Sequence, residues 1–206
     1  MTKAVVSSPA RLFLTAFAAL GLVTLVFDGT RGGVLPVGAP RGGQELAAAG
    51  ELPNVSIERA DGTTTTFAAT DGQVRIVTMI YGHCPGVCPM TIDSLRGIDR
   101  QLTRQQRSKL NFVLLSLDPI RDTPEALRSL AQERGIASSR WLIGRTSASD
   151  ARAFASAAHI QYRPLSDGSI DHSTVLVLLD ARGRVLARTG DAENAAPFMA
   201  VLRGAL

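Results

Sequence analysis

Short apolar runs alternate with amphipathic stretches through the central and C-terminal parts of the chain. Residues 74–81, 110–117 and 175–179 are dominated by apolar and β-branched side chains, a pattern typical of strands buried on both faces. Apolar residues between positions 92 and 102 instead recur at helical spacing. Because such strands alternate with helices, the pattern predicts an α/β fold in which helices flank a central sheet.

Turn and capping residues complete the predicted elements. Residues 55–59 and 63–67 flank an Asp-Gly pair at 61–62, which predicts an N-terminal β-hairpin. Residues 123–125 (TPE) have the cap, first-position proline and first-turn acid of a helix start, and Gly135 ends that helix. The remaining predicted elements are a short strand at 141–143, a helix from Ser147 or Ser149 to about Ala158, a strand at 185–188 and a closing helix at 197–206.

The N-terminal residues differ in character from this pattern. Lys3 and Arg11 precede an almost unbroken apolar stretch from Leu12 to Phe27, as in a signal peptide or a short membrane anchor. No convincing small-residue cleavage site follows, so we expect residues 1–28 to be an uncleaved anchor, with the basic end inside and the following domain exported. Residues 29–52 are rich in Gly, Ala and Pro and predict a flexible linker. Residues 53–206 then form the folded domain.

The charge pattern argues against nucleic acid as a partner. The formal net charge is +4, from 22 Lys and Arg against 18 Asp and Glu. The arginines are scattered, without a basic run or interleaved aromatic residues, which indicates a solvated basic exterior.

Both cysteines lie in residues 83–89 (HCPGVCP), between a predicted strand and a predicted helix. Pro89 suits the first helical position, so the thiols lie at or beside a helix N-terminus, where the helix dipole favours thiolate over thiol. A structural disulfide is disfavoured because it would close a very small loop. Thiol–disulfide exchange remains open, although its usual spacing is C-x-x-C. A Cu(I), zinc or Fe–S site also remains open, and its third ligand would be His83, His159 or His172.

Three motifs, in this order, resemble the SCO/SenC proteins: residues 83–89 (HCPGVCP), 117–125 (LDPIRDTPE) and 171–173 (DHS). The resemblance covers residues 55–206, and an N-terminal anchor also fits. SCO/SenC proteins are membrane-anchored, thioredoxin-like proteins that bind copper and serve assembly of the CuA site of cytochrome c oxidase. The resemblance therefore implies a thioredoxin-like central sheet flanked by helices, with an N-terminal β-hairpin.

The same resemblance implies that copper is held by Cys84, Cys88 and His172. Two thiolates and one imidazole suit Cu(I) and can also hold Cu(II). Structural zinc is disfavoured because it normally has four protein ligands, and a fourth bond from His83 would be strained by its adjacency to Cys84. The family usually has Asp where this chain has Gly86, so a charge beside the metal loop is missing here.

The leading hypothesis is thus a copper metallochaperone, a binding and delivery protein rather than a turnover enzyme. Its expected partners are the copper-bearing subunit of cytochrome c oxidase, other copper chaperones and the membrane. The expected location is the bacterial periplasmic face, with the mitochondrial inner membrane as the alternative. The second hypothesis is a thiol–disulfide oxidoreductase in which Cys84 and Cys88 are catalytic and reduce the CuA-site cysteines. A thiol peroxidase is a third.

Other polar residues near the motifs have specific expectations. Asp118 ends the strand beside the cysteine loop, so it is either the carboxylate that supports the metal ligands or a cap for the turn at Pro119. His159 is expected to be a helix C-terminal histidine, favoured by the helix dipole. Asp171 is expected to point away from the face occupied by His172, because successive strand residues alternate.

Overall fold

The computed structural model describes residues 51–206, apart from residues 85 and 192–194. The predicted anchor (1–28) and nearly all of the predicted linker (29–52) lie outside the described residues, so both remain predictions. Within the part that is described, we find no helix with both the length and the apolar character needed to cross a bilayer.

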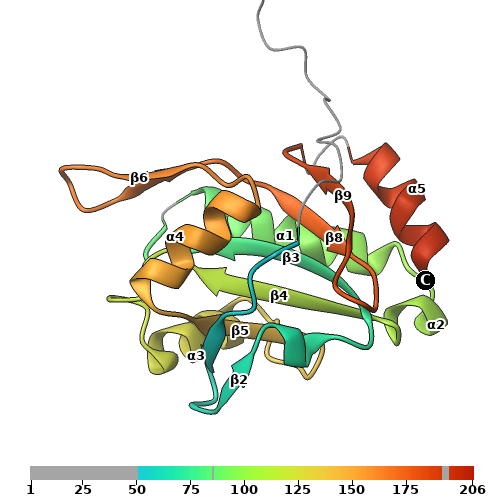
Figure 1. Cartoon of the computed structure of the whole chain (residues 1–206), viewed down its shortest axis with the longest axis horizontal. Coiled ribbons are helices and arrows are strands. Elements are labelled where there is room, and N and C mark those ends of the chain that lie inside the picture. Colours follow the sequence, from blue (N-terminus) through green and yellow to red (C-terminus); the bar gives the residue numbers. More distant parts are fainter. Residues whose placement is uncertain (1–50, 85, 192–194) are drawn as a thin grey trace, which may run out of the picture. The chain divides into compact units, whose positions relative to one another are not determined.

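The described chain forms a seven-stranded sheet in the order β2-β1-β5-β4-β3-β8-β9 (Figure 1). The central strands β3, β4 and β5 run parallel to one another, whereas β1 joins β5 and β8 joins β3 in antiparallel fashion. The strands are β1 (Ser56–Arg59), β2 (Thr64–Thr66), β3 (Val74–Ile80), β4 (Leu110–Ser116), β5 (Trp141–Arg145), β8 (Leu176–Leu179) and β9 (Val185–Thr189).

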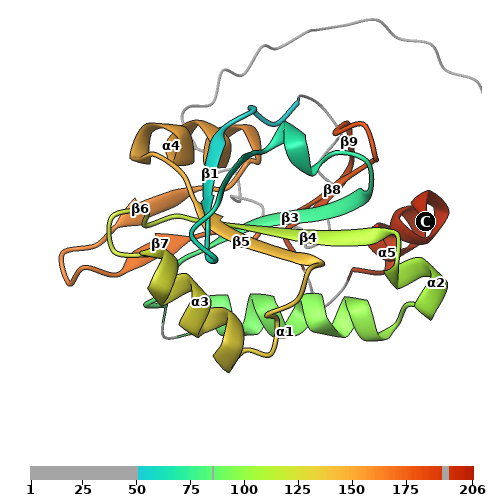
Figure 2. The same ribbon diagram turned by 90° about the horizontal axis from the view of Figure 1, so that it is seen from below.

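Helices cover both faces of this sheet. Figure 2 shows α1 and α3 on one face and α4 on the other. All residues of β3 and β8 are buried, as expected for strands covered on both faces. The helices are α1 (Val87–Arg100), α2 (Arg104–Arg107), α3 (Pro124–Glu133), α4 (Ala148–Ala157) and α5 (Ala196–Ala205), and a 3-10 turn spans Ala68–Thr70.

Local signals placed most of these elements correctly. The Thr123 side chain accepts a hydrogen bond from the N–H of Ala126 at the start of α3, and Ser147 caps α4 in the same way. Gly62 has φ +84° in the turn of the predicted N-terminal hairpin. Helix α1 begins at Val87, two residues before the predicted start, and it ends at Arg100.

The sequence pattern missed a second hairpin. Strands β6 (Tyr162–Pro164) and β7 (Ile170–His172) pair with each other and form a small sheet of their own. Each strand is three residues long and partly exposed, so neither carries the apolar run that marks a buried strand. His172 is the last residue of β7.

The expectation that the arginines form a solvated exterior is wrong for two of them. Arg75 and Arg188 are 0% and 1% exposed. The Arg75 guanidinium on β3 pairs with Asp71 and lies 5.3 Å from the centre of the Phe67 ring. A buried cation requires such partners, because desolvation without them is costly.

Candidate metal centre

The cysteine loop joins β3 to α1 at the carboxyl end of the central strands, the edge where open α/β sheets place their sites. Cys84 lies in the loop and is partly exposed, whereas Cys88 is the second residue of α1 and is only 2% exposed. Both are free thiols. The prediction that the two sulfurs lie beside a helix N-terminus is therefore confirmed.

The fold brings one histidine to this pair. The sulfurs of Cys84 and Cys88 and a ring nitrogen of His172 all lie within 4.8 Å of one another. The Cys88 Sγ to His172 Nε2 distance is 3.5 Å. Among the described residues, these three side chains form the group whose atoms are placed to bind one metal ion together. These are the three residues that the SCO/SenC resemblance implied.

The two thiols differ in acidity. Burial works to raise the pKa of Cys84, but the N–H groups of Cys88 and Gly86 hydrogen-bond to its sulfur, and the net effect lowers that pKa. The Cys88 N–H to Cys84 Sγ distance is 3.2 Å. Burial raises the pKa of Cys88 strongly, and the nearby Cys84 raises it further. Cys84 is therefore the thiol with the larger thiolate fraction at neutral pH.

Tyr81 connects the cysteine loop to the hairpin that carries His172. Its backbone N–H points to Cys88 Sγ at 3.4 Å, and its hydroxyl oxygen accepts a hydrogen bond from the N–H of Ile170 at 3.3 Å. The Tyr81 ring also meets the His172 ring edge to face, with centroids 5.7 Å apart. His172 Nδ1 lies 3.2 Å from the carbonyl oxygen of Ser173, which leaves Nε2 toward the sulfurs.

Comparison with known proteins identifies the family of this chain. The SCO1/SenC family model matches residues 53–206. The chain belongs to the SCO1/SenC family. Yeast (Saccharomyces cerevisiae) mitochondrial protein SCO2 is 27% identical over 126 residues, which cover 58% of this chain and 40% of that protein. A Stutzerimonas stutzeri protein named for copper binding is 36% identical over 58 residues, 28% of either chain. The chain thus matches less than half the length of these curated relatives.

Solved structures confirm the thioredoxin-like fold expected for a SCO1/SenC protein. Arabidopsis thaliana ScoI, solved with copper bound, superposes with a TM-score of 0.66 at 21% identity, over 75% of this chain and 99% of that one. Bradyrhizobium japonicum ScoI with copper bound gives 0.64 at 20% identity, over 76% and 100%. At this level of identity the likeness shows the fold.

The contacts of Asp118 are with residues of its own loop and of the end of β4. Its carboxylate pairs with Arg121, and its backbone N–H donates to Ser116 Oγ at 2.9 Å. The carboxylate that contacts the cysteine loop belongs to Asp122, which lies within the motif at residues 117–125. Asp122 is 0% exposed, and burial raises its pKa while hydrogen bonds from Ser116 and Gly82 oppose that rise.

The other predicted residues lie at the margins of the site. His83 is largely exposed, with Nδ1 3.7 Å from Asp122 Oδ1. His159 follows α4 with φ +61°, so it occupies the helix C-terminal position expected of it. The exposed Asp171 carboxylate pairs with Arg163 at 3.1 Å, away from the metal cluster. A side-chain carbon added at Gly86 would meet nothing within 4 Å, so the packing leaves room for the family's usual Asp.

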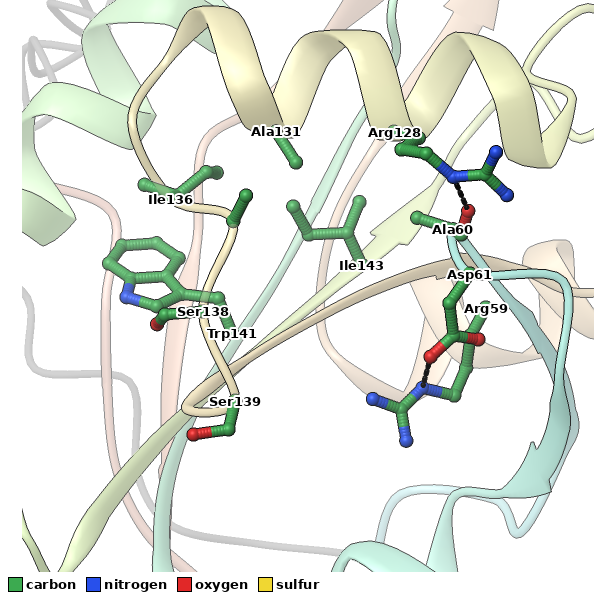
Figure 3. Close-up of a pocket in the computed structure, with 11 residues that line it drawn as sticks. Arg59, Ala60, Asp61, Arg128, Ala131, Ile136, Ser138, Ser139, Trp141 and Ile143 are labelled. Atoms are coloured by element: carbon green, nitrogen blue, oxygen red, sulfur yellow. Dashed lines mark hydrogen bonds and ion pairs between the residues drawn. The ribbon is translucent and has the colours of Figure 1, made fainter.

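A separate cavity of about 390 Å³ lies between α3, the β1–β2 turn and the start of β5 (Figure 3). Arg128 closes one side by donating to the carbonyl of Ala60 at 2.9 Å, and Trp141 and Ile143 form its apolar wall. None of the three metal-cluster side chains lines this cavity. The metal cluster is therefore a small group of soft donors at the sheet edge rather than part of this pocket.

Proposed function

We propose that this chain binds one copper ion through Cys84, Cys88 and His172 and delivers it to the CuA site of cytochrome c oxidase. The observation that carries the proposal is the three-donor group, whose ligand atoms all lie within 4.8 Å of one another. Two sulfurs and an imidazole nitrogen match the preference of copper for soft and borderline ligands. The copper-bound ScoI structures of the same fold give independent support.

The coordination number suits transfer rather than storage. A structural zinc site encloses its ion with four protein ligands, whereas three ligands leave a position open. Cys84 is partly exposed, so a thiolate of another protein can reach the ion while Cys88 and His172 still hold it. Copper therefore passes by ligand exchange, without a change of valence and without release into water.

An apolar rim beside this entry point supports protein-to-protein delivery. The large apolar side chains that are most exposed in the described chain belong to segments adjoining the metal cluster or the loop that contacts it. Two lie in the first turn of α1, one in the loop before α3 and one in the β6–β7 hairpin. They are Val87, Met90, Ile120 and Leu165, with exposures of 45%, 59%, 81% and 39%. Exposed apolar side chains on these segments offer contacts for a partner protein.

We further propose that residues 1–28 anchor the protein to a membrane, with the copper-binding domain on the exported side. The basic start and the apolar stretch from Leu12 to Phe27 support this proposal. The copper-bearing subunit of the oxidase would then be reached along the same membrane surface.

A specific observation also favours the thiol–disulfide alternative. Cys84, with its lowered pKa, has the character of an attacking thiol, and the buried Cys88 that of a resolving thiol. In that function, Cys84 would attack an oxidised CuA-site disulfide and form a mixed disulfide. Cys88 would then displace it, so that the target gains two thiols and this chain becomes oxidised.

His172→Ala separates the two functions, because thiol exchange needs both sulfurs but no imidazole. We expect the variant to lose most of the Cu(II)–thiolate charge-transfer absorption and to bind Cu(I) more weakly, while it still reduces disulfides. His159→Ala is the matched control, since His159 lies outside the cluster. Cells that carry only His172→Ala should lose oxidase activity at limiting copper and regain it with excess copper. Normal oxidase activity at limiting copper would refute delivery and leave the thiol oxidoreductase.

A further inference from the structure

Asp122 is a buried carboxylate to which neither proposed function assigns a role. It lies in the loop between β4 and α3 and is 0% exposed. It is separated by 40 residues from Gly82, yet the two are in direct contact. A carboxylate is costly to bury unless hydrogen-bond donors compensate it, so the donors around Asp122 are the next question.

The donors to Asp122 come from the ends of two neighbouring strands, since Gly82 follows β3 and Ser116 ends β4. The N–H of Gly82 lies 3.0 and 3.1 Å from the two carboxylate oxygens. The Ser116 hydroxyl lies 2.5 Å from Oδ2. Because Ser116 Oγ already accepts the N–H of Asp118, its single hydrogen is free to point at Asp122. The carboxylate thus bridges the end of β4 and the first residues of the cysteine loop.

The contact with Gly82 leaves no room for a side chain unless the Asp122 carboxylate shifts. A side-chain carbon added at Gly82 would come within 2.8 Å of Asp122 Oδ1. The backbone of Gly82 therefore approaches the carboxylate as closely as it does because it carries no side chain.

This contact fixes the segment that leads to Cys84. The Tyr81 N–H is held by Cys88 Sγ at 3.4 Å, the Gly82 N–H by Asp122, and the Cys84 N–H by the Tyr81 carbonyl at 3.3 Å. Of these three attachments, the one from Asp122 is made by a distant part of the chain. It is also charge-assisted and is therefore the strongest kind of hydrogen bond.

We propose that Asp122 is a positioning residue for the metal loop: it holds Gly82 so that Cys84 stays within reach of the copper ion bound by Cys88 and His172. This inference rests on the proposed copper-binding function. Asp122 is not a ligand in this scheme, and it acts through the backbone of Gly82. The competing explanation is that Asp122 stabilises the fold and has no influence on the metal.

The test compares Asp122→Asn with Asp99→Asn. Asp99 is the control because its carboxylate, on a side chain that is 18% exposed, also ties two elements together, by pairing with Arg140 at 2.8 and 2.9 Å. It lies near the end of α1 that is remote from Cys88. Asn keeps the shape of Asp but removes the negative charge and replaces one acceptor oxygen with a donor. The Gly82 N–H therefore loses one of its two acceptor oxygens and the charge assistance of the other.

Copper affinity and absorption are the primary measurements. Cu(I) affinity is measured by competition with bathocuproine disulfonate, and the Cu(II)–thiolate charge-transfer band is recorded for each folded variant. We expect Asp122→Asn to bind Cu(I) about 10- to 100-fold more weakly, the range seen when support of a metal ligand is lost, and to show a weaker or shifted band. Asp99→Asn should match the wild type in both. Wild-type affinity and an unchanged band in Asp122→Asn would overturn the proposal.

A metal-free measurement separates this inference from the proposed function. If the wild-type protein binds no copper, the proposed function fails, and the alkylation rate of Cys88 by iodoacetamide then tests the loop directly. Cys88 is 2% exposed, so a loosened loop should speed its alkylation in Asp122→Asn but not in Asp99→Asn. Equal rates in the two variants would then refute the positioning role.

Two further variants keep the test open if Asp122→Asn does not fold. Ser116→Ala removes one donor to Asp122, and Gly82→Ala crowds the same contact from the loop side. Both should weaken Cu(I) binding, and their effects should be less than additive when combined, because they act through one contact. Unchanged affinity in both single variants would overturn the proposal.

Discussion

Tyr81→Phe offers a test of how His172 is brought to the two sulfurs. The change removes one oxygen atom and leaves the ring that meets His172 edge to face. The lost oxygen accepts the N–H of Ile170 at 3.3 Å, and both residues are buried, with exposures of 3% and 8%. We therefore expect the Ile170 N–H to be left without an acceptor in the variant.

The size of the effect follows from that unsatisfied N–H group. Leaving a buried donor without its partner costs about 1–3 kcal/mol. Every 1.4 kcal/mol changes an equilibrium constant tenfold. If the whole cost falls on docking of the hairpin that carries His172, the equilibrium constant for docking falls by about 5- to 150-fold. Cu(II) binding should weaken within that range, because Cu(II) needs the nitrogen donor. Cu(I) should be affected less, since two thiolates alone can retain it.

The assay is Cu(II) titration against a competing chelator, read at the thiolate charge-transfer band, with urea unfolding of the metal-free protein as a parallel measurement. Tyr162→Phe is the control, because Tyr162 lies opposite His172 on β6 and its hydroxyl makes no hydrogen bond that we find among the described residues. If Tyr81→Phe lowers the free energy of unfolding but changes Cu(II) affinity by less than twofold, the hydroxyl supports the fold without positioning His172, and the reasoning is wrong.

Four further predictions test other parts of the account. Leu114→Ala in the central strand β4 should lower the free energy of unfolding in urea by about 2–5 kcal/mol, because Leu114 is 0% exposed; a loss below about 1 kcal/mol would contradict its place in the core. Since the pKa of Cys88 is raised, copper must displace its proton, and Cu(I) affinity should rise about tenfold per pH unit for each proton released; a flat profile between about pH 6 and 8 would contradict this. Ile120→Glu should leave copper affinity unchanged but reduce oxidase activity at limiting copper, and full activity would argue against the apolar rim. The full-length chain should resist alkaline carbonate extraction from membranes, and release into the supernatant would contradict the anchor.

Local sequence signals determined the architecture of the domain. The apolar runs at β3, β4 and β8, the Asp-Gly turn of the first hairpin and the Thr123 cap of α3 each depend on residues close together in the chain. Such signals are readable because strand and helix periodicity is a local property. The cysteine loop was located for the same reason, since a buried strand and an amphipathic helix flank it.

The residue pattern left the third ligand open among three histidines, and the family resemblance pointed to His172. Tertiary structure decided how His172 reaches the sulfurs and which residues support the site. His172 lies 84 residues from Cys88, on a hairpin too short and too exposed to leave a periodic pattern, and Tyr81 holds that hairpin in place. Because Asp118 directly follows the predicted strand, the sequence left it as either the supporting carboxylate or a cap for the turn at Pro119. The turn at Pro119 instead directs Asp118 to Arg121 and brings Asp122 back to Gly82, a contact made possible by the missing side chain of a glycine 40 residues away. Contacts between residues so far apart in the chain depend on how the loops at the end of the sheet pack against one another. The periodicity of apolar residues does not predict that packing, because it reports only on residues close together in the chain.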